Sequence, residues 1–186
     1  MNILENLLGY NNSFLNGIDV GGIEYRTKFD FEPKVCLGLA FGTSGYNGRL
    51  AETIFDAEKY FGGMKVIAQK EIYDLSLSKN IIPVGESPKG GVPTLKSDIG
   101  TREILELSLP YIIDDEKSNI LFVAHPAHIY RVMKMGEKLG LQGHPFIEKK
   151  VFWSDPDDKQ IWTRSPVLYA PREIAVRMIL SKRGQF

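Results

Sequence analysis

The sequence has very little of three features that would place it in a specialised class of protein. Cys36 is the single cysteine among 186 residues, so neither an internal disulfide framework nor a zinc site built from cysteines can form. No apolar run approaches the roughly 20 residues of a membrane-spanning helix. The first residues, which include Glu5 and asparagines, also lack the basic and apolar regions of a signal peptide. These absences make the cytoplasm the default location.

The chain also lacks an excess of charge of either sign. Lys and Arg together number 23, as do Asp and Glu, so the formal net charge is zero. Broad binding to nucleic acid or to an anionic membrane needs a surplus of basic residues. We therefore expect neither a nucleic-acid partner nor a membrane partner, while a local basic site and a homo-oligomer stay open.

What the sequence does contain is an alternation of apolar runs and amphipathic segments. Residues 35–41 and 119–124 are apolar at almost every position, which is typical of strands buried on both faces of a parallel sheet. Segments with helical spacing follow both runs, and such alternation indicates an α/β fold. We predict a three-layer Rossmann-like sandwich with a mostly parallel sheet of at least four strands, in which these two are central.

The chain is long enough for one domain with a full core. We expect residues 1–186 to form a single α/β domain, with 1–33 as an N-terminal arm packed on it and 154–186 as a C-terminal extension and helix. A loop rich in Gly and Pro over 85–96 is expected to be a mobile flap over the strand ends.

The last helix is expected to begin at Pro171, because proline suits the first helical position. Residues 160–169 before it would then be a strand or an extended arm. The spacing of the apolar residues predicts a buried stripe that consists of Ile174, Ala175, Met178 and Ile179.

The strongest signal for a functional site is the stretch 125–131, where an apolar strand ends at His125 and a helix begins. The free N–H groups and the positive dipole end of that helix favour an anion. His128 and Arg131 lie on nearly the same side of it and could bind an anion or transfer a proton near neutral pH. The alternatives are that His125 is a helix cap or a core histidine, and that Arg131 lies on a solvated side.

Helical phase places Arg131 at the flank of the buried stripe of its helix. On this basis Arg131→Ala should weaken the binding of an anionic ligand by roughly 1.5–3 kcal/mol. It should change the stability of the fold only slightly.

A glycine-rich loop follows the first apolar run. Glycine lets backbone N–H groups approach a phosphate or a carboxylate closely. The pattern is neither a G-x-G-x-x-G fingerprint nor a P-loop, so a tight turn without a ligand stays an alternative. The ligand-binding candidates here are Gly42, Thr43, Ser44, Gly45 and Arg49.

A third helix start follows the long loop. Thr101 can cap this helix and Glu103 suits its dipole; a purely structural role for both stays open. We take His128 and Glu103 as candidate catalytic residues and add Thr101, His125 and Arg131 to the ligand-binding set. A His-x-x-His pair with scattered carboxylates is a poor zinc set, so no metal is expected, and no cofactor can be named.

Together these elements resemble the SanA/ElyC/YdcF-type family, a bacterial domain of unknown function. The resemblance covers roughly residues 35–145 and rests on four features. These are a strand with Leu37-Gly38 running to Gly42, Arg49 at the next helix start, Thr101-Arg102-Glu103, and His128-x-x-Arg131 ahead of Gly140. The resemblance implies a Rossmann-like fold with a polar site at the strand ends.

Two functions are compatible with these observations. The first is a small-molecule-binding protein or enzyme that acts on a phosphate- or nucleotide-like anionic ligand at the C-terminal edge of the sheet. Side chains from three helix starts should converge there, namely Arg49, Glu103, His128 and Arg131. The alternative is a non-catalytic partner-binding module. It predicts no such cluster, and an exposed apolar surface on the N-terminal arm or around Phe152, Trp153 and Trp162.

Overall fold

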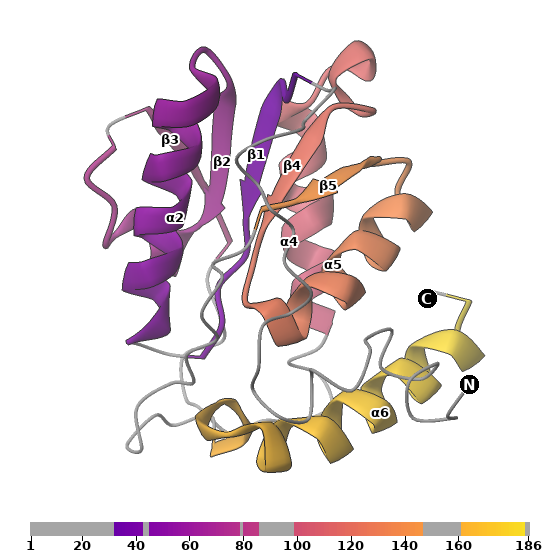
Figure 1. Cartoon of the computed structure of the whole chain (residues 1–186). Helices are drawn as coiled ribbons and strands as arrows, with labels where there is room; N and C mark the ends of the chain where they lie inside the picture. The colour runs from indigo at the N-terminus through magenta and orange to yellow at the C-terminus, as the bar shows by residue number, and fades with distance from the viewer. Residues whose placement is uncertain (1–31, 43–44, 79, 86–98, 147–160, 185–186) are drawn as a thin grey trace.

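The computed structural model describes residues 32–42, 45–78, 80–85, 99–146 and 161–184. They form a five-stranded, all-parallel sheet with helices on both faces (Figure 1). The order of the strands is β3-β2-β1-β4-β5. Their bounds are Val35–Gly38 for β1, Lys65–Gln69 for β2, Ile81–Val84 for β3, Ile120–Val123 for β4 and Gly143–Pro145 for β5. The predicted Rossmann-like α/β fold is confirmed.

The two strands predicted to be central are central. β1 pairs with β2 on one side and with β4 on the other, and β4 also pairs with β5. Every residue of β1 and β4 is buried, which explains why neither strand alternates between apolar and polar residues. β3 is an edge strand with an exposed Pro83, where a missing N–H is tolerated.

Alternate residues of the strands face two separate apolar cores. One core joins the sheet to α2 (Tyr46–Phe61) and α3 (Lys70–Tyr73), and it includes Leu121 of β4 and Ile54 of α2. The other joins it to α4 (Ile99–Ser108) and α5 (Pro126–Lys138), with Phe122 of β4 facing that side. Two short 3₁₀ turns, η3 (Leu109–Tyr111) and η4 (Asp114–Glu116), lead from α4 to β4.

The C-terminal part of the chain differs from its prediction. η5 (Ile161–Arg164) is a 3₁₀ turn, and α6 runs over Pro166–Lys182, so the expected strand or arm over 160–169 and a helix start at Pro171 are wrong. The reason is a stronger start signal upstream. The Ser165 side chain accepts a hydrogen bond from the Leu168 N–H at 3.3 Å, and Pro166 occupies the first helical position.

α6 lies across one end of the sheet, apart from the other helices (Figure 1). Tyr169, in its first half, packs into the core shared with α2, whereas Val176, in its second half, packs into the core shared with α5. The predicted buried stripe of this helix is wrong, because Ala175 and Met178 are exposed. The buried side consists instead of Tyr169, Ala170, Glu173, Val176, Arg177 and Leu180.

Other expectations fall outside the described residues or were missed. Apart from residues at their ends, the N-terminal arm over 1–33 and the loop over 85–96 lie outside the described residues. β5 was not predicted, because Gly143-His144-Pro145 has no apolar alternation. Within the part of the chain that the structure describes, no helix has the length and apolarity needed to cross a membrane.

Substitution of Gly143 tests how closely β5 packs against β4 at the edge of the sheet. A Cβ atom at Gly143 would lie 1.8 Å from the backbone oxygen of Ile120, so Gly143→Ala should separate β5 from β4. We expect a loss of at least about 1 kcal/mol in the free energy of unfolding, measured by urea denaturation. Gly100→Ala is the matched control, because nothing lies within 4 Å of its Cβ position. It should be neutral or slightly stabilising, and equal effects of the two changes would contradict the packing described here.

Candidate functional site

The order of the strands identifies where a ligand would sit in a sheet of this kind. The chain moves outward from β1 to β2 and β3, and then returns to the other side of β1 as β4. Ligands of open parallel sheets bind in the crevice at such a reversal, beyond the carboxyl ends of the two strands. Here the crevice lies between residues 39–42, after β1, and residues 124–125, after β4. The sequence-based site prediction points to this same edge.

Aromatic rings fill the base of this crevice. The ring of Phe41 stacks on His125 with a centroid distance of 3.7 Å and an interplanar angle of 9°. Tyr46 meets His125 edge-on at 4.6 Å, and Tyr169 of α6 lies 5.5 Å from Phe41. His125 is fully buried, and its Nδ1 atom accepts a hydrogen bond from the Ala127 N–H at 3.1 Å. The helix-cap alternative for His125 is therefore confirmed.

Two side chains that sequence reasoning missed hold the loop after β1. The Gln69 side chain accepts a hydrogen bond from the Ala40 N–H at 3.0 Å, and Asn47 accepts one from the Phe41 N–H at 2.9 Å. Asn47 is fully buried and also donates to the Gly42 carbonyl at 3.4 Å. These two backbone N–H groups are therefore engaged inside the protein. Gly42 has a φ of 76° and makes the turn, whereas Thr43 and Ser44 lie outside the described residues.

Three of the predicted site residues are in contact. The Thr101 hydroxyl, in the first turn of α4, lies 3.4 Å from Nε2 of His128. Arg131 Nη1 donates to the same hydroxyl oxygen at 3.5 Å. An oxygen that accepts from Arg131 is free to donate its own hydrogen to Nε2, which places the hydrogen of the neutral imidazole on Nδ1. Nδ1 of His128 is buried and has no hydrogen-bond partner in the described structure.

A buried ion network joins this cluster to α6. The Glu173 carboxylate accepts from Arg131 Nε at 3.2 Å, from Arg177 Nε at 2.9 Å and from the Tyr169 hydroxyl at 2.9 Å. Burial alone would raise the pKa of the Glu173 carboxyl, but the charges of Arg131 and Arg177 outweigh burial and hold that pKa below its ordinary value. Glu173 is therefore an anion bound between two arginines.

The neighbours of His128 keep its imidazole neutral. Burial lowers the pKa of His128 well below its ordinary value of 6.5, and the positive charges of Arg131, His125, Arg172 and Arg177 lower it further. At neutral pH the ring therefore offers one N–H donor and one acceptor nitrogen. The positive surroundings that disfavour a charged imidazole also favour a bound anion.

The burial of Arg131 corrects the earlier expectation for this residue. Arg131 is only 3% exposed and forms an ion pair with Glu173, so it lies neither on a solvated side nor off the buried surface of α5. The prediction failed because α5 is covered on two sides, by the sheet and by α6. A second apolar or polar surface packed against a helix cannot be read from the periodicity of that helix alone.

The other predicted residues do not all join the cluster. Glu103 is exposed and lies two residues after Thr101, about 200° around the helix, so it faces away from His128 and is no partner for it. Arg49 is partly buried in the first turn of α2, and its approach to the cluster stays a prediction. Gly45 is exposed at the start of α2.

The functional residues that sequence reasoning missed belong mainly to α6. Tyr169, Glu173 and Arg177 follow i, i+4, i+8 spacing, which places them on one face of a helix. That spacing of an aromatic residue, an acid and a base was a usable signal. It was overlooked because a rule that buries apolar residues assigns charged residues to the outside.

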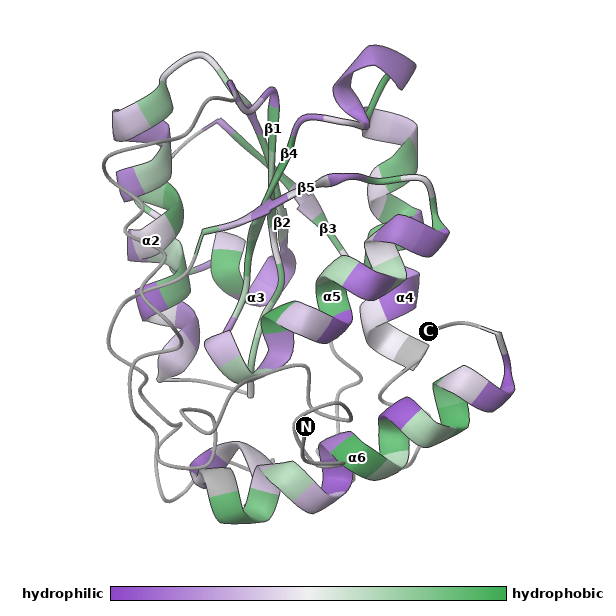
Figure 2. Ribbon diagram, turned by 45° about the vertical axis from the view of Figure 1, so that its right-hand side comes forward, coloured by the Kyte–Doolittle hydropathy of each residue, from purple (hydrophilic) through white to green (hydrophobic). Residues whose placement is uncertain are grey.

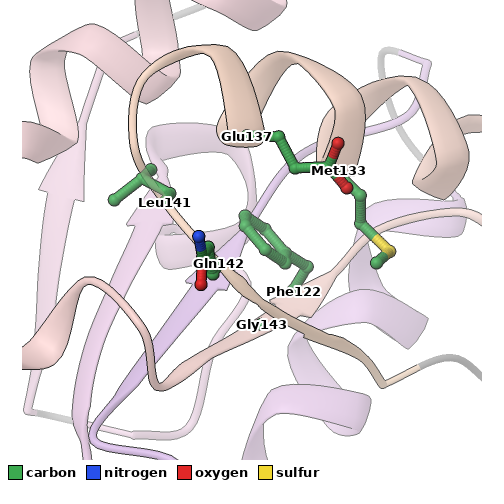
Figure 3. A pocket seen from close by; sticks show the side chains of 6 residues that line it. All are labelled: Phe122, Met133, Glu137, Leu141, Gln142 and Gly143. Atoms are coloured by element: carbon green, nitrogen blue, oxygen red, sulfur yellow. The ribbon is translucent and has the colours of Figure 1, made fainter.

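A cavity in the described structure lies away from the cluster of Thr101, His128 and Arg131. It has a volume of about 360 Å³ and lies between the second half of α5 and β5, with Phe122, Met133 and Leu141 as its apolar wall (Figure 3). Glu137 at its rim pairs with Lys134 at 2.7 Å. None of the predicted site residues lines this cavity, and its one ionised wall residue is an acid, so it does not suit an anionic ligand.

The partner-binding alternative predicts exposed aromatic residues, and Trp162 is the one of the three named aromatics that the structure describes. Trp162 is buried, and the guanidinium of Arg172 lies over its ring at 4.5 Å. Phe152 and Trp153 lie outside the described residues. Within the described ranges, no group of three His, Cys, Asp or Glu side chains is placed to hold a metal ion.

No protein-family model matches the chain, and comparison with curated proteins and with solved structures finds no similar protein.

The ion network predicts a large effect on stability for one substitution. Arg131→Met leaves the buried Glu173 without one of its two arginines, so we expect the free energy of unfolding to fall by about 3–5 kcal/mol. The double change Arg131→Met with Glu173→Gln should recover part of this loss, because it also removes the buried charge. Urea denaturation of the two single variants and the double variant measures the coupling. Additive losses would contradict a direct interaction.

A pH dependence follows from the lowered pKa of His128. Below about pH 6.5 the unfolded chain protonates this imidazole and the folded chain does not, so the unfolded state binds more protons. The free energy of unfolding should therefore fall as pH drops from about 7.5 to about 5, by up to ~1.4 kcal/mol per unit. His128→Gln should show a shallower fall, whereas Glu173 titrates below this interval. Identical slopes for the two proteins would contradict a neutral, buried His128.

Proposed function

We propose that this chain binds a small phosphate- or nucleotide-like anion at the C-terminal edge of its sheet, at the start of α5. The observation that carries the proposal is the buried Nδ1 atom of His128, which has no hydrogen-bond partner in the described structure. A buried polar atom without a partner is costly, and native proteins rarely retain one without a reason. A ligand acceptor atom would satisfy it.

The surroundings of His128 favour an anion over a neutral or cationic ligand. The charges of Arg131, Arg172 and Arg177 act on this imidazole. The first turn of α5 adds the positive end of a helix dipole, which independently favours negative charge. An N–H donor within such a positive environment suits a phosphoryl or carboxylate oxygen.

Glu173 provides an internal example of the chemistry that this edge favours. Its carboxylate is held by two arginines and by the Tyr169 hydroxyl. Three donors around one carboxylate form an anion site, although the occupant belongs to the chain itself. We infer that a ligand phosphate binds next to this carboxylate and shares Arg131 with it.

Three residues of the candidate site also belong to the motifs that suggested a family. Thr101, His128 and Arg131 are part of the resemblance to the SanA/ElyC/YdcF-type family, and the Thr101 hydroxyl contacts both of the other side chains. We therefore propose that the chain is a divergent relative of that family.

An acid–base enzyme is the second candidate function, and the low pKa of His128 favours it. A general base must be unprotonated at the working pH, and this imidazole is. In this role Nδ1 would accept the proton, so the hydrogen of the neutral imidazole would lie on Nε2 and be donated to the Thr101 hydroxyl oxygen. The enzyme candidate therefore requires the opposite tautomer from the binding proposal. Glu103 has no part in this proposal, because it is exposed on the other side of α4.

Two substitutions of His128 distinguish which ring nitrogen contacts the ligand, and so test the binding proposal. Asparagine places its amide nitrogen near the position of Nδ1, whereas glutamine places it near Nε2. We expect His128→Gln to weaken binding of pyrophosphate or AMP by about 1.5–3 kcal/mol, roughly tenfold to a hundredfold. His128→Asn should retain most of the affinity. Calorimetric titration gives the affinities, and melting temperatures of the free proteins show whether both variants fold.

Three outcomes would contradict the proposal. The first is that the unmodified protein binds neither pyrophosphate nor AMP. The second is that both variants bind as tightly as the unmodified protein. The third is that His128→Asn loses more affinity than His128→Gln, which would make Nε2 the ligand atom.

A further inference from the structure

The outward face of α6 is apolar, although its inward face includes two charged residues beside four apolar ones. Glu173 and Arg177 lie on the buried side, whereas Val167 is 77% exposed, Met178 51% and Leu168 48%. A charged pair inside and apolar side chains in water are both unusual for a helix on a protein surface. The side chains on the outside of α6 therefore need an explanation separate from the core.

The exposed apolar residues form one continuous stripe. At 100° per residue, five positions fall within an arc of about 100° on the helix, namely Val167, Leu168, Pro171, Ala175 and Met178. All five are exposed. The buried residues of α6 occupy the opposite arc, so one face of the helix packs on the strand ends and the other is directed outward.

Positive charge borders this stripe. Lys182 and Arg183 are exposed at the C-terminal end of α6, and Arg164 and Arg172 are partly exposed nearer its start. Across residues 161–184 Glu173 is the sole acid, and it is buried. The exposed side of this segment is therefore basic, on a chain whose formal net charge is zero.

Among the described residues, the elements are arranged so that this face of α6 is accessible. The sheet and the other described helices all lie on one side of α6 (Figure 1), and the same is seen after a turn of 45° (Figure 2). A flat partner could therefore contact the length of the stripe without meeting the rest of the described structure.

We propose that the outward face of α6 docks on an anionic lipid bilayer. A helix with an apolar stripe and basic borders lies in the plane of the membrane interface, with its stripe buried about 5–10 Å into the boundary between headgroups and acyl chains. Basic side chains beside the stripe are attracted to the anionic headgroups. This is a peripheral contact. It reverses the expectation drawn from net charge, which averages over the whole chain.

A second copy of the chain fits this face less well. Antiparallel packing of two α6 helices would bring Lys182 and Arg183 of one copy towards Arg164 of the other. Parallel packing would bring the basic ends of the two copies together. Both arrangements oppose like charges with no exposed acid in residues 161–184 to compensate them, and such juxtaposition is unfavourable. Anionic headgroups provide the charge that a second copy lacks.

Co-sedimentation with vesicles tests the proposal. The full chain should pellet with vesicles of phosphatidylcholine mixed with phosphatidylglycerol, and much less with phosphatidylcholine alone. Met178→Asp should lower the partition coefficient at least about tenfold, because it removes apolar area from the stripe and adds a negative charge. Leu77→Asp is the matched control, since Leu77 is 85% exposed but lies outside α6, and it should bind as the unmodified protein does.

A second variant tests the basic border. Lys182→Gln with Arg183→Gln should lower partitioning to the anionic vesicles roughly thirtyfold and leave binding to neutral vesicles unchanged. Raising the salt concentration to about 1 M should reproduce this loss in the unmodified protein, because charges are then screened beyond about 3 Å. Thermal unfolding shows whether each variant remains folded.

Four results would overturn the proposal. They are no binding to either kind of vesicle, equal binding to both kinds, equal losses for Met178→Asp and Leu77→Asp, and a dimer in solution that Met178→Asp dissociates while vesicles bind neither protein. The last result would assign the stripe to a second copy of the chain. The headgroups carry phosphate, but Met178, Lys182 and Arg183 lie outside the proposed anion site around His128. Losses caused by changing these three residues therefore test this face separately from the anion site.

Discussion

The structure depends on a buried carboxylate, Glu173, which holds the C-terminal helix against the end of the sheet. Three donors converge on it, from Arg131 of α5 and from Tyr169 and Arg177 of α6 itself. Removing charged groups from water is expensive, and the attraction between them repays that cost only when the geometry is good and the hydrogen bonds are satisfied. This requirement determines which face of α6 is turned inward, because a face that carries Glu173 and Arg177 is stable inside only where Arg131 meets it.

The same network decides the character of the candidate site. By lying across the strand ends, α6 buries Arg131 and closes His128 off from water, and burial is the main cause of the low pKa of that imidazole. His128 then keeps one nitrogen on Thr101 and one nitrogen without a partner. Polar groups at a strand end are usually hydrated in the absence of a ligand. Here they are held in a dry, positive environment, where electrostatic interactions with a bound group are stronger.

Turning the charged face inward has a cost on the other side of the same helix. Several apolar residues of α6 are left in water, with Val167 and Met178 among the exposed side chains. The two proposals made for this chain therefore have one structural origin. The buried face of α6 organises an anion site at the sheet edge, and its outward face is available for an anionic surface. The buried face contributes one basic residue, Arg177, which pairs with Glu173, whereas Lys182 and Arg183 are exposed at the C-terminal end of the helix.

The sequence by itself determined the class of fold and the edge at which polar residues gather. Residues 35–41 and 119–124 are apolar at almost every position. That pattern is typical of a strand buried on both faces, so β1 and β4 could be placed at the centre. The placement of His128 and Arg131 on nearly the same side of α5 follows from local helical spacing. Only the tertiary structure decided the orientation of α6, the burial of Arg131 and the exposure of Glu103 away from His128. The periodicity of apolar residues indicates one buried face of a helix, whereas α5 is buried on two sides, by the sheet and by α6. The buried face of α6 was selected by an ion pair between residues 42 positions apart in the sequence, which local pattern cannot reveal.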